Sequence, residues 1–404
     1  MTAVPPGTAT VVRAGDPAVP RPGGSVLVDL PAGHLDDPPG RAGLAALLAA
    51  VLNEPRCGGA AARAAVEGWR TRHHLDDHSS SFAYWSHRPA ALASVVDDLR
   101  RTRLPAGAAG EELLARLRAR VVAAAEGHGA PLLVLVRRQL ERASWGALPH
   151  DRITTRDTVA EVTPAELARS VDLLVDRARV HDATTAPDRD GGAPHGTPQG
   201  AVRGAARRAD GDAPSWHGGL DTDVRADSDA RVAVRLPVQD PPPGVLELLV
   251  EVLGNGTDGR LHHELRHRNH LAYGFTAACS RQHGRASIDA TATVAPQHAA
   301  AAVRVLVEAL RRLAEGVGPE ETASARWRYR AGLLAESDGP FGPADELRRH
   351  VLGRSGTGER LAAVADLDVL PGPSFAPLPP AVAAVGPFDE RHRRQLAAAY
   401  EEIR

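Results

Sequence analysis

The chain has 404 residues, 43% of them hydrophobic, so it is long and apolar enough to bury a core in each of two domains. Its formal net charge is −2, and all 48 basic residues are arginine, because the sequence contains no lysine. This balance excludes the global basic field of a nucleic-acid-binding protein and a polybasic membrane anchor.

The positions of the cysteines and the lengths of the apolar runs exclude further kinds of site and of membrane association. Cys57 and Cys279 lie far apart and outside C-x-x-C spacing, so they indicate neither a disulfide framework nor a thiolate metal site. Met1–Val11 lacks a charged segment followed by an apolar run, and no stretch approaches the roughly 18 apolar residues that span a membrane. We therefore predict a cytoplasmic protein that binds neither membrane nor nucleic acid.

Strands and helices alternate along the chain. Residue alternation predicts strands at Ser25–Leu30, Arg231–Leu236, Ala272–Ser280 and Ser287–Val294. Helical periodicity predicts helices at Gly43–Asn53, Pro89–Thr102, Glu111–Ala125, Pro131–Ser144, Pro164–Val175, Gly244–Gly254, Gly259–His267, Pro296–Glu315, Pro319–Leu334 and Glu390–Ile403. Several strands meet through short connections, which favours an α+β fold with a mainly antiparallel sheet and helices packed on one face of it.

The same pattern is written twice. SVLVDLPAGHLDDPPGRAGLAALLAAVL and RVAVRLPVQDPPPGVLELLVEVL each give an alternating strand, a proline turn and an apolar helix, and further blocks match at an offset of about 206 to 211 residues. Between the copies, a segment rich in Gly, Pro, Asp and Arg is typical of a linker. We predict two homologous units, at 1–185 and 216–404, joined by a flexible linker at 186–215.

The apolar helix of the first unit carries a resemblance to a known family. Its sequence GLAALLAAV, Gly43–Val51, is similar to the Gly-Leu-Ala-His-Phe-Leu-Glu-His-Met run of the pitrilysin/insulinase family of inverted-zincin peptidases, which includes the mitochondrial processing peptidases. The apolar frame matches, but the residues that would carry the chemistry differ. Ala46 and Ala50 stand where the family has its two zinc histidines, and Ala49 stands where it has the general-base glutamate.

These substitutions bear directly on metal binding. Catalytic zinc needs three protein ligands and a bound water that a base deprotonates, and methyl groups supply none of these. The third ligand in the family is a glutamate on a later helix, and either Glu126 or Ala125 falls near its place. The resemblance implies that this chain holds no zinc and is inactive alone, with the metal expected in a partner subunit.

The second half resembles the family most closely. LGNGTDGRLHHELRHRNHLAYGFTAACSRQHGRASIDATATV is similar to the family's glycine-rich turn, Arg-Leu helix, Leu-Arg-x6-Tyr element and hairpin. Arg266 and Tyr273 match the pair that, in the family, reaches toward the zinc site and holds substrate. The chemistry fits, because a guanidinium donates to peptide carbonyls and a phenol donates to a developing oxyanion.

Two histidine clusters offer other metal sites. His263, Glu264 and His267 spell H-E-x-x-H, the direct zincin pattern, but the segment is short and polar, and a third ligand would have to come from His270 or His283. The run HHLDDH places His74 and His78 one helical turn apart beside Asp77, although its composition favours a solvated loop leading into a strand.

The resemblance implies a half-clam of two units that pairs with a homologous H-x-x-E-H subunit and encloses a peptide substrate. The expected function is that of the zinc-less, substrate-binding subunit of a heterodimeric metallopeptidase, with removal of a leader peptide from a ribosomally made peptide as one use. Two alternatives remain open: a non-enzymatic scaffold subunit of a larger complex, and an autonomous zincin that uses His263, Glu264 and His267.

Overall fold

The computed structural model describes most of the chain. The residues described are 11–13, 23–30, 33, 36–38, 40–75, 80–127, 131–146, 154–182, 215–239, 241–242, 244–254, 258–352 and 354–404. Of the predicted linker, only Ser215 is among them, so residues 186–214 lie outside the described residues. The chain divides into two compact units, each assembled from three separate segments. Unit 1 comprises Met1–His128, Pro149–Arg208 and Ala335–Gly356, and unit 2 comprises Gly129–Leu148, Ala209–Leu334 and Thr357–Arg404.

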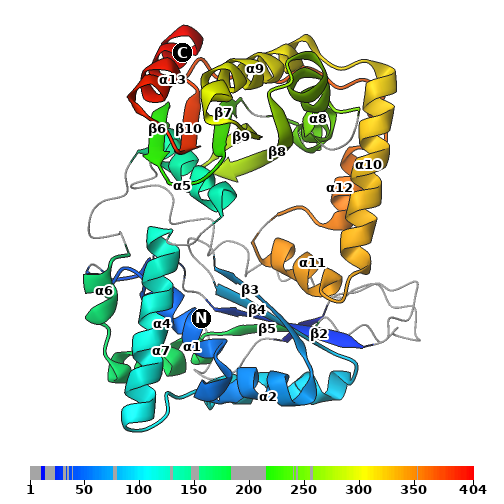
Figure 1. Cartoon of the computed structure of the whole chain (residues 1–404). Helices are drawn as coiled ribbons and strands as arrows, with labels where there is room; N and C mark the ends of the chain where they lie inside the picture. The colour runs from blue at the N-terminus through cyan, green and yellow to red at the C-terminus, as the bar shows by residue number, and fades with distance from the viewer. Residues whose placement is uncertain are drawn as a thin grey trace. The chain divides into compact units, whose positions relative to one another are not determined.

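Unit 1 is built around a five-stranded sheet (Figure 1). The strand order is β1 (Val11–Arg13), β5 (Arg179–Asp182), β2 (Gly24–Leu30), β4 (Ser80–Ser86) and β3 (Arg70–Leu75), with β1 and β5 parallel and the other pairs antiparallel. One face packs on a layer formed by α1 (Leu44–Leu52), α2 (Gly59–Glu67), α3 (Val95–Arg100), α4 (Ala108–Glu126), α6 (Arg156–Ala160) and α7 (Pro164–Asp176). Alternate strand residues such as Val28 and Phe82 supply the sheet's side of this core.

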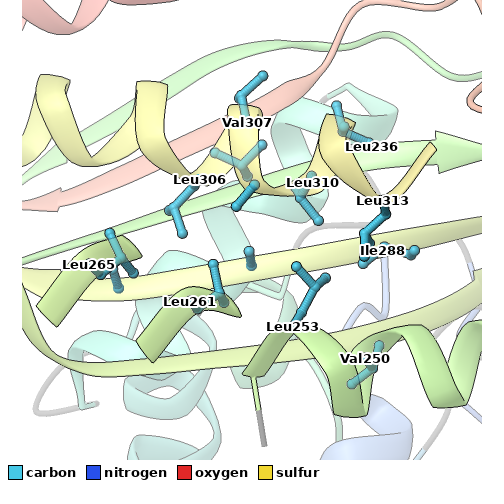
Figure 2. Close-up of a cluster of buried hydrophobic side chains, with 14 of the residues drawn as sticks. Leu236, Val250, Leu253, Leu261, Leu265, Ile288, Leu306, Val307, Leu310 and Leu313 are labelled. Carbon is cyan, nitrogen blue, oxygen red and sulfur yellow. The ribbon is translucent and has the colours of Figure 1, made fainter. Parts of the chain in front are cut away.

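Unit 2 repeats this arrangement. Its sheet has the order β6 (Gly219–Val224), β10 (Ala381–Gly386), β7 (Ala230–Val238), β9 (Arg285–Val294) and β8 (Ala272–Gln282), again with only the outermost pair, β6 and β10, parallel. The main helical layer consists of α8 (Val245–Gly254), the π-helix η5 (His262–Arg268), α9 (Ala299–Arg311), α10 (Pro319–Asp338), α12 (Thr357–Ala363) and α13 (Glu390–Ile403). Figure 2 shows the core of this layer, where Leu306 and Leu310 of α9 meet Leu261, Leu265 and Ile288.

The two strand orders correspond position by position, since each strand of unit 2 takes the place of the strand five numbers earlier. The prediction of a repeated α+β unit with a mainly antiparallel sheet is therefore confirmed. The four predicted strands are present, and each predicted helix falls on a helical segment. Among the helices of the residues given above, none combines the length and apolar character needed to cross a bilayer.

Each sheet also carries one helix on its second face, which the prediction of helices on a single face omitted. Helix α5 (Leu132–Trp145) comes from the N-terminal half of the chain but packs on β10, β7 and β6 of unit 2, as Figure 1 also shows. Helix α11 (Gly342–Val351) comes from the C-terminal half but packs on β2 and β5 of unit 1. We call α5 and α11 the exchanged helices.

A buried ion pair anchors the exchanged helix α5. The guanidinium of Arg235 on β7 is only 5% exposed, and it donates to both oxygens of Asp289, at 2.7 and 2.8 Å. It also donates to Glu141 Oε1 at 2.8 Å and Ser144 Oγ at 3.3 Å, both on α5. Although burial opposes its charge, these carboxylates hold the pKa of Arg235 above its usual value. The second face of this sheet therefore binds its helix through polar as well as apolar contacts.

Candidate functional site

The three alanines aligned with the family's zinc motif by the sequence resemblance, Ala46, Ala49 and Ala50, are part of a packed helix. Ala49 and Ala50 of α1 are 4% and 9% exposed, and the half-buried Ala46 packs against the same core. The helix begins after Gly43, whose φ of 96° lies in the left-handed region that favours glycine. No charged or hydrogen-bonding side chain is presented at these three positions, so α1 has a structural role here.

A buried carboxylate fixes the start of this helix. Asp37 accepts backbone N–H bonds from Gly43 at 2.7 Å and from Ala45 at 2.8 Å, and so satisfies donors that the first turn leaves unpaired. Burial nevertheless raises the pKa of Asp37 to about 6, against the opposing effect of those backbone bonds. Helix α1 therefore has a strong N-terminal anchor.

The candidate third ligand lies at the end of another helix. Glu126 is the last residue of α4, exposed, and followed by Gly127 in the left-handed conformation. Helix α4 packs against α1. Within the parts of the chain that the structure describes, no three His, Cys, Asp or Glu side chains are grouped as a metal site.

The segment that carries Arg266 departs from regular helical winding. Residues His262–Arg268 form a π-helix, in which the hydrogen bonds run from i to i+5 and each turn holds an extra residue. Leu261 and Leu265 are fully buried in the core of unit 2, whereas Arg266 is exposed. The apolar pair fastens the segment to the core, and Arg266 is left on its outer side.

The end of the π-helix reverses the chain sharply. His270 has a φ of 53°, which is uncommon for a residue other than glycine. Around it, Asn269 N–H donates to Glu264 O at 3.2 Å and Leu271 N–H donates to Leu265 O at 2.8 Å. This is a widened form of the left-handed cap that closes many helices.

Tyr273 follows at a second irregularity. The pairing of β8 with β9 shifts register between Ala272 and Gly274, so Tyr273 is the extra residue of a β-bulge. A π-helix, a left-handed residue and a bulge therefore occur within about a dozen residues, and Arg266 and Tyr273 lie on two of the three. Such irregularities cluster at functional sites because they aim side chains that regular winding would turn elsewhere.

The segment that carries Arg266 and Tyr273 matches a known family model. The family model described as "Peptidase M16 inactive domain" matches residues 223–329, about a quarter of the chain. That stretch includes the whole Arg/Tyr element.

Residues 223–329 match an inactive M16 domain. This supports the family whose motifs the sequence resembles. No curated protein sequence is similar enough to count as a match.

Solved structures share the fold over nearly the whole chain. A chain of complex III2 from Candida albicans, in a structure with Inz-5 bound, has a TM-score of 0.63 and 13% identity, covering 96% of this chain and 98% of its own. The peptidase M16 inactive domain from Pseudomonas fluorescens has a TM-score of 0.61 and 14% identity, covering 95% and 98%. At such low identity these likenesses show the two-unit α+β fold alone.

The H-E-x-x-H pattern inside the M16-like segment does not assemble a zincin site. The π-helical winding brings the rings of His262 and His267 edge to face, with centroids 4.7 Å apart, while the ring centroids of His263 and His267 are 6.4 Å apart. Glu264 Oε1 accepts from Arg268 at 3.0 Å and from Arg312 at 3.2 Å, so its carboxylate is neutralised by two guanidiniums. The spacing assumed an α-helix, in which residues four apart share a face.

The other histidines that the sequence offered as possible metal ligands lie in two places. His283, one of the possible third ligands, packs its ring against Trp145 at 4.8 Å. His73 and His74 lie in strand β3, so the prediction of a solvated loop there is wrong; the strand pairs with β4 and stacks His73 on Phe82. Asp77 and His78 fall outside the described residues.

Neither cysteine is set up for reactivity. Cys57 is buried in the core of unit 1, and Cys279 is partly buried on β8. Burial raises the pKa of Cys57 to about 11 and that of Cys279 to about 12, so both stay protonated thiols near neutral pH.

Proposed function

We propose that this chain is the zinc-less, substrate-binding subunit of a heterodimeric metallopeptidase and that it supplies Arg266 and Tyr273 to the zinc site of its partner. The observation that carries the proposal is a contrast between two elements of one chain. The metal helix has alanine at every position where the family has zinc or base chemistry, whereas the Arg/Tyr element sits on a specialised backbone. The match to an inactive M16 domain supports the same assignment.

The partner in this proposal is a homologous subunit with an intact H-x-x-E-H helix, and the substrate is a peptide. The partner binds zinc and generates the attacking hydroxide. Arg266 donates to substrate carbonyls and orients the chain, while the Tyr273 phenol stabilises the oxyanion that forms at the scissile carbonyl. Leader-peptide removal from a ribosomally made peptide is the use we propose to test first.

The test reconstitutes peptide cleavage from the full-length chain and its H-x-x-E-H partner. Arg266→Ala and Tyr273→Phe should each lower kcat/KM by roughly 10²-fold or more, the usual effect of losing an oxyanion donor or a charged substrate anchor. Arg394→Ala and Tyr400→Phe serve as matched controls on α13, since Arg394 is 77% exposed and the Tyr400 hydroxyl donates to Pro380 O within unit 2. Unchanged cleavage in both site variants would rule out the proposed role.

A second candidate is a non-enzymatic scaffold subunit. It is favoured by the complex III2 chain, which shares the fold over 96% of this chain. A scaffold would remain in a stable assembly with its partners, and none of those assemblies would cleave peptides. Size-exclusion chromatography of the reconstituted complex, with cleavage assayed across the same fractions, separates the two proposals.

A further inference from the structure

A charged groove lies beside the π-helix. It has a volume of about 320 Å³ and runs between η5 and α9 of unit 2. Arg268, Arg304 and Arg312 line it together with Glu264 and Glu308, over a floor that includes Val305 and Ala309. Each of these arginines bonds a carboxylate: Arg304 pairs with Glu402 at 2.5 Å, and the other two pair within the groove. An ion-pair network therefore lines the groove and joins η5 to the end of α9.

Glu264 is the centre of that network. Its side chain is only 16% exposed and accepts from Arg268 within the π-helix and from Arg312, which begins the 3₁₀ turn after α9. Its backbone oxygen accepts from both the N–H and the side-chain Nδ2 of Asn269, the latter at 2.8 Å. Glu264 therefore bonds to residues of the π-helical turn, of its capped end and of the turn that follows α9.

The winding of this segment decides where Arg266 points. Returning the turn to α-helical winding would remove one residue from it and rotate the following side chains by about 100°. That rotation would carry Leu265 out of the core or Arg266 away from its present side. It would also break the hydrogen bond from Leu271 N–H to Leu265 O. Leu271 lies directly before β8 and two residues before Tyr273. Arg266 and Tyr273 therefore depend on the same local geometry.

We propose that Glu264 is a positioning residue: its bond to Arg312 holds residues 262–268 in the π-helical winding and so fixes Arg266 and Tyr273 relative to one another. This inference rests on the proposed function, because it assigns Glu264 a role through the Arg/Tyr pair. Charge-assisted bonds are suited to the task, since a guanidinium and a partly buried carboxylate constrain direction as well as distance. The glutamate of the H-E-x-x-H pattern is thus an anchor for the fold of the site.

The chain offers a matched control for this proposal. Glu308 accepts from Nε of the same Arg312 at 2.9 Å, but it lies on α9, is 57% exposed and has no bond to the π-helix in the described residues. Glu264→Gln and Glu308→Gln each remove one negative charge from the Arg312 guanidinium. Only Glu264→Gln acts on the bond that joins the π-helix η5 to Arg312.

The first experiment needs no partner. The chain contains only four tyrosines, so incorporating 3-fluorotyrosine gives four ¹⁹F resonances, and Tyr273→Phe identifies that of Tyr273. Glu264→Gln and Arg312→Ala should each shift or broaden the Tyr273 resonance and leave the other three in place. Glu308→Gln should leave all four unchanged. A Tyr273 resonance that is the same in Glu264→Gln as in Glu308→Gln would overturn the proposal.

The second experiment uses the reconstituted complex. Glu264→Gln should lower kcat at least tenfold, whereas Glu308→Gln should leave it unchanged. The two proposals fail in different ways. If Arg266→Ala leaves cleavage unchanged, the proposed function fails; if Arg266→Ala abolishes cleavage while Glu264→Gln matches Glu308→Gln, only the positioning role fails.

Discussion

At the scale of single residues, unit 1 contains two buried groups whose titrations oppose each other. His181 on β5 is 3% exposed, and burial lowers its pKa to about 4. Asp37, at the start of α1, has its pKa raised to about 6. The neutral form of each side chain is favoured in the folded state, because burial disfavours charge.

The pH dependence of stability follows from the difference in proton binding between the folded and unfolded states. Protonation of His181 in the unfolded chain begins near its ordinary value of 6.5, so its contribution to stability is present above that pH and is lost as the pH falls toward 4. For Asp37 the contribution is present below 3.8 and is lost as the pH rises to about 6. Each shift is worth on the order of 3 kcal/mol, and the two nearly cancel between pH 4 and 6.

Removing one of the pair should therefore expose the other. Relative to wild type, His181→Leu should gain stability as the pH falls from 6.5 to 4, while Asp37→Asn should lose it over the same range. Urea unfolding at several pH values measures both, and His298→Leu, at an exposed position, is the control. Parallel profiles for all three variants would show that neither buried group sets the pH dependence.

At the scale of elements, the ten helices predicted from the sequence are present, but the sequence predicted only four of the strands and did not predict α2, α6, α11 or α12. β7 and β2 were found because their alternation is interrupted only slightly. Strand β10, AVAAVG, was missed because it contains no polar residue and so shows no alternation, whereas β2 and β7, although also buried on both faces, carry polar residues such as Asp29 and Arg235. The π-helix was also beyond prediction, since the apolar residues Leu261 and Leu265 have ordinary α-helical spacing and the extra residue leaves no mark in the pattern.

The cap of the π-helix carries a prediction of its own. A left-handed backbone costs a residue with a Cβ roughly 1 kcal/mol, and it costs a β-branched residue more. His270→Val should therefore lower the free energy of unfolding by about 1 to 2 kcal/mol, whereas His270→Gly should be neutral or slightly stabilising. Denaturant unfolding of the two variants decides the matter, and equal stability would mean that the reversal at this residue is not retained in solution.

At the scale of the whole molecule, the repeat could be predicted but the exchange of helices could not. Two copies of one pattern suggest two independent halves that divide at a linker. Periodicity predicted α5 but not α11, and it carries no information on which sheet a helix covers. A partial signal was present in the strands, because Arg235 stands within a run of apolar residues and needs buried partners, which Asp289 and Glu141 provide.

The exchange predicts how the chain can be divided. A fragment of residues 216–404 lacks α5, so it leaves Ala233, Ala381, Ala383 and Val385 uncovered on the second face of the sheet. It also removes Glu141 from a guanidinium that is 5% exposed in the intact chain. A fragment beginning at Gly129 restores α5, whose Leu135, Val136 and Leu140 bury side chains worth roughly 5 to 9 kcal/mol together, the larger figure being an upper bound.

We therefore expect 129–404 to unfold cooperatively at a markedly higher temperature than 216–404, which should bind hydrophobic dyes or aggregate. The variant Leu135→Ala with Leu140→Ala in 129–404 tests whether the apolar face of α5 is the cause, and it should fall toward the shorter fragment. Equal melting temperatures for the two fragments would contradict the exchange. Because 129–404 also carries α6, α7 and β5 of unit 1, which 216–404 lacks, the double-alanine variant is the comparison that isolates the pairing of α5 with unit 2.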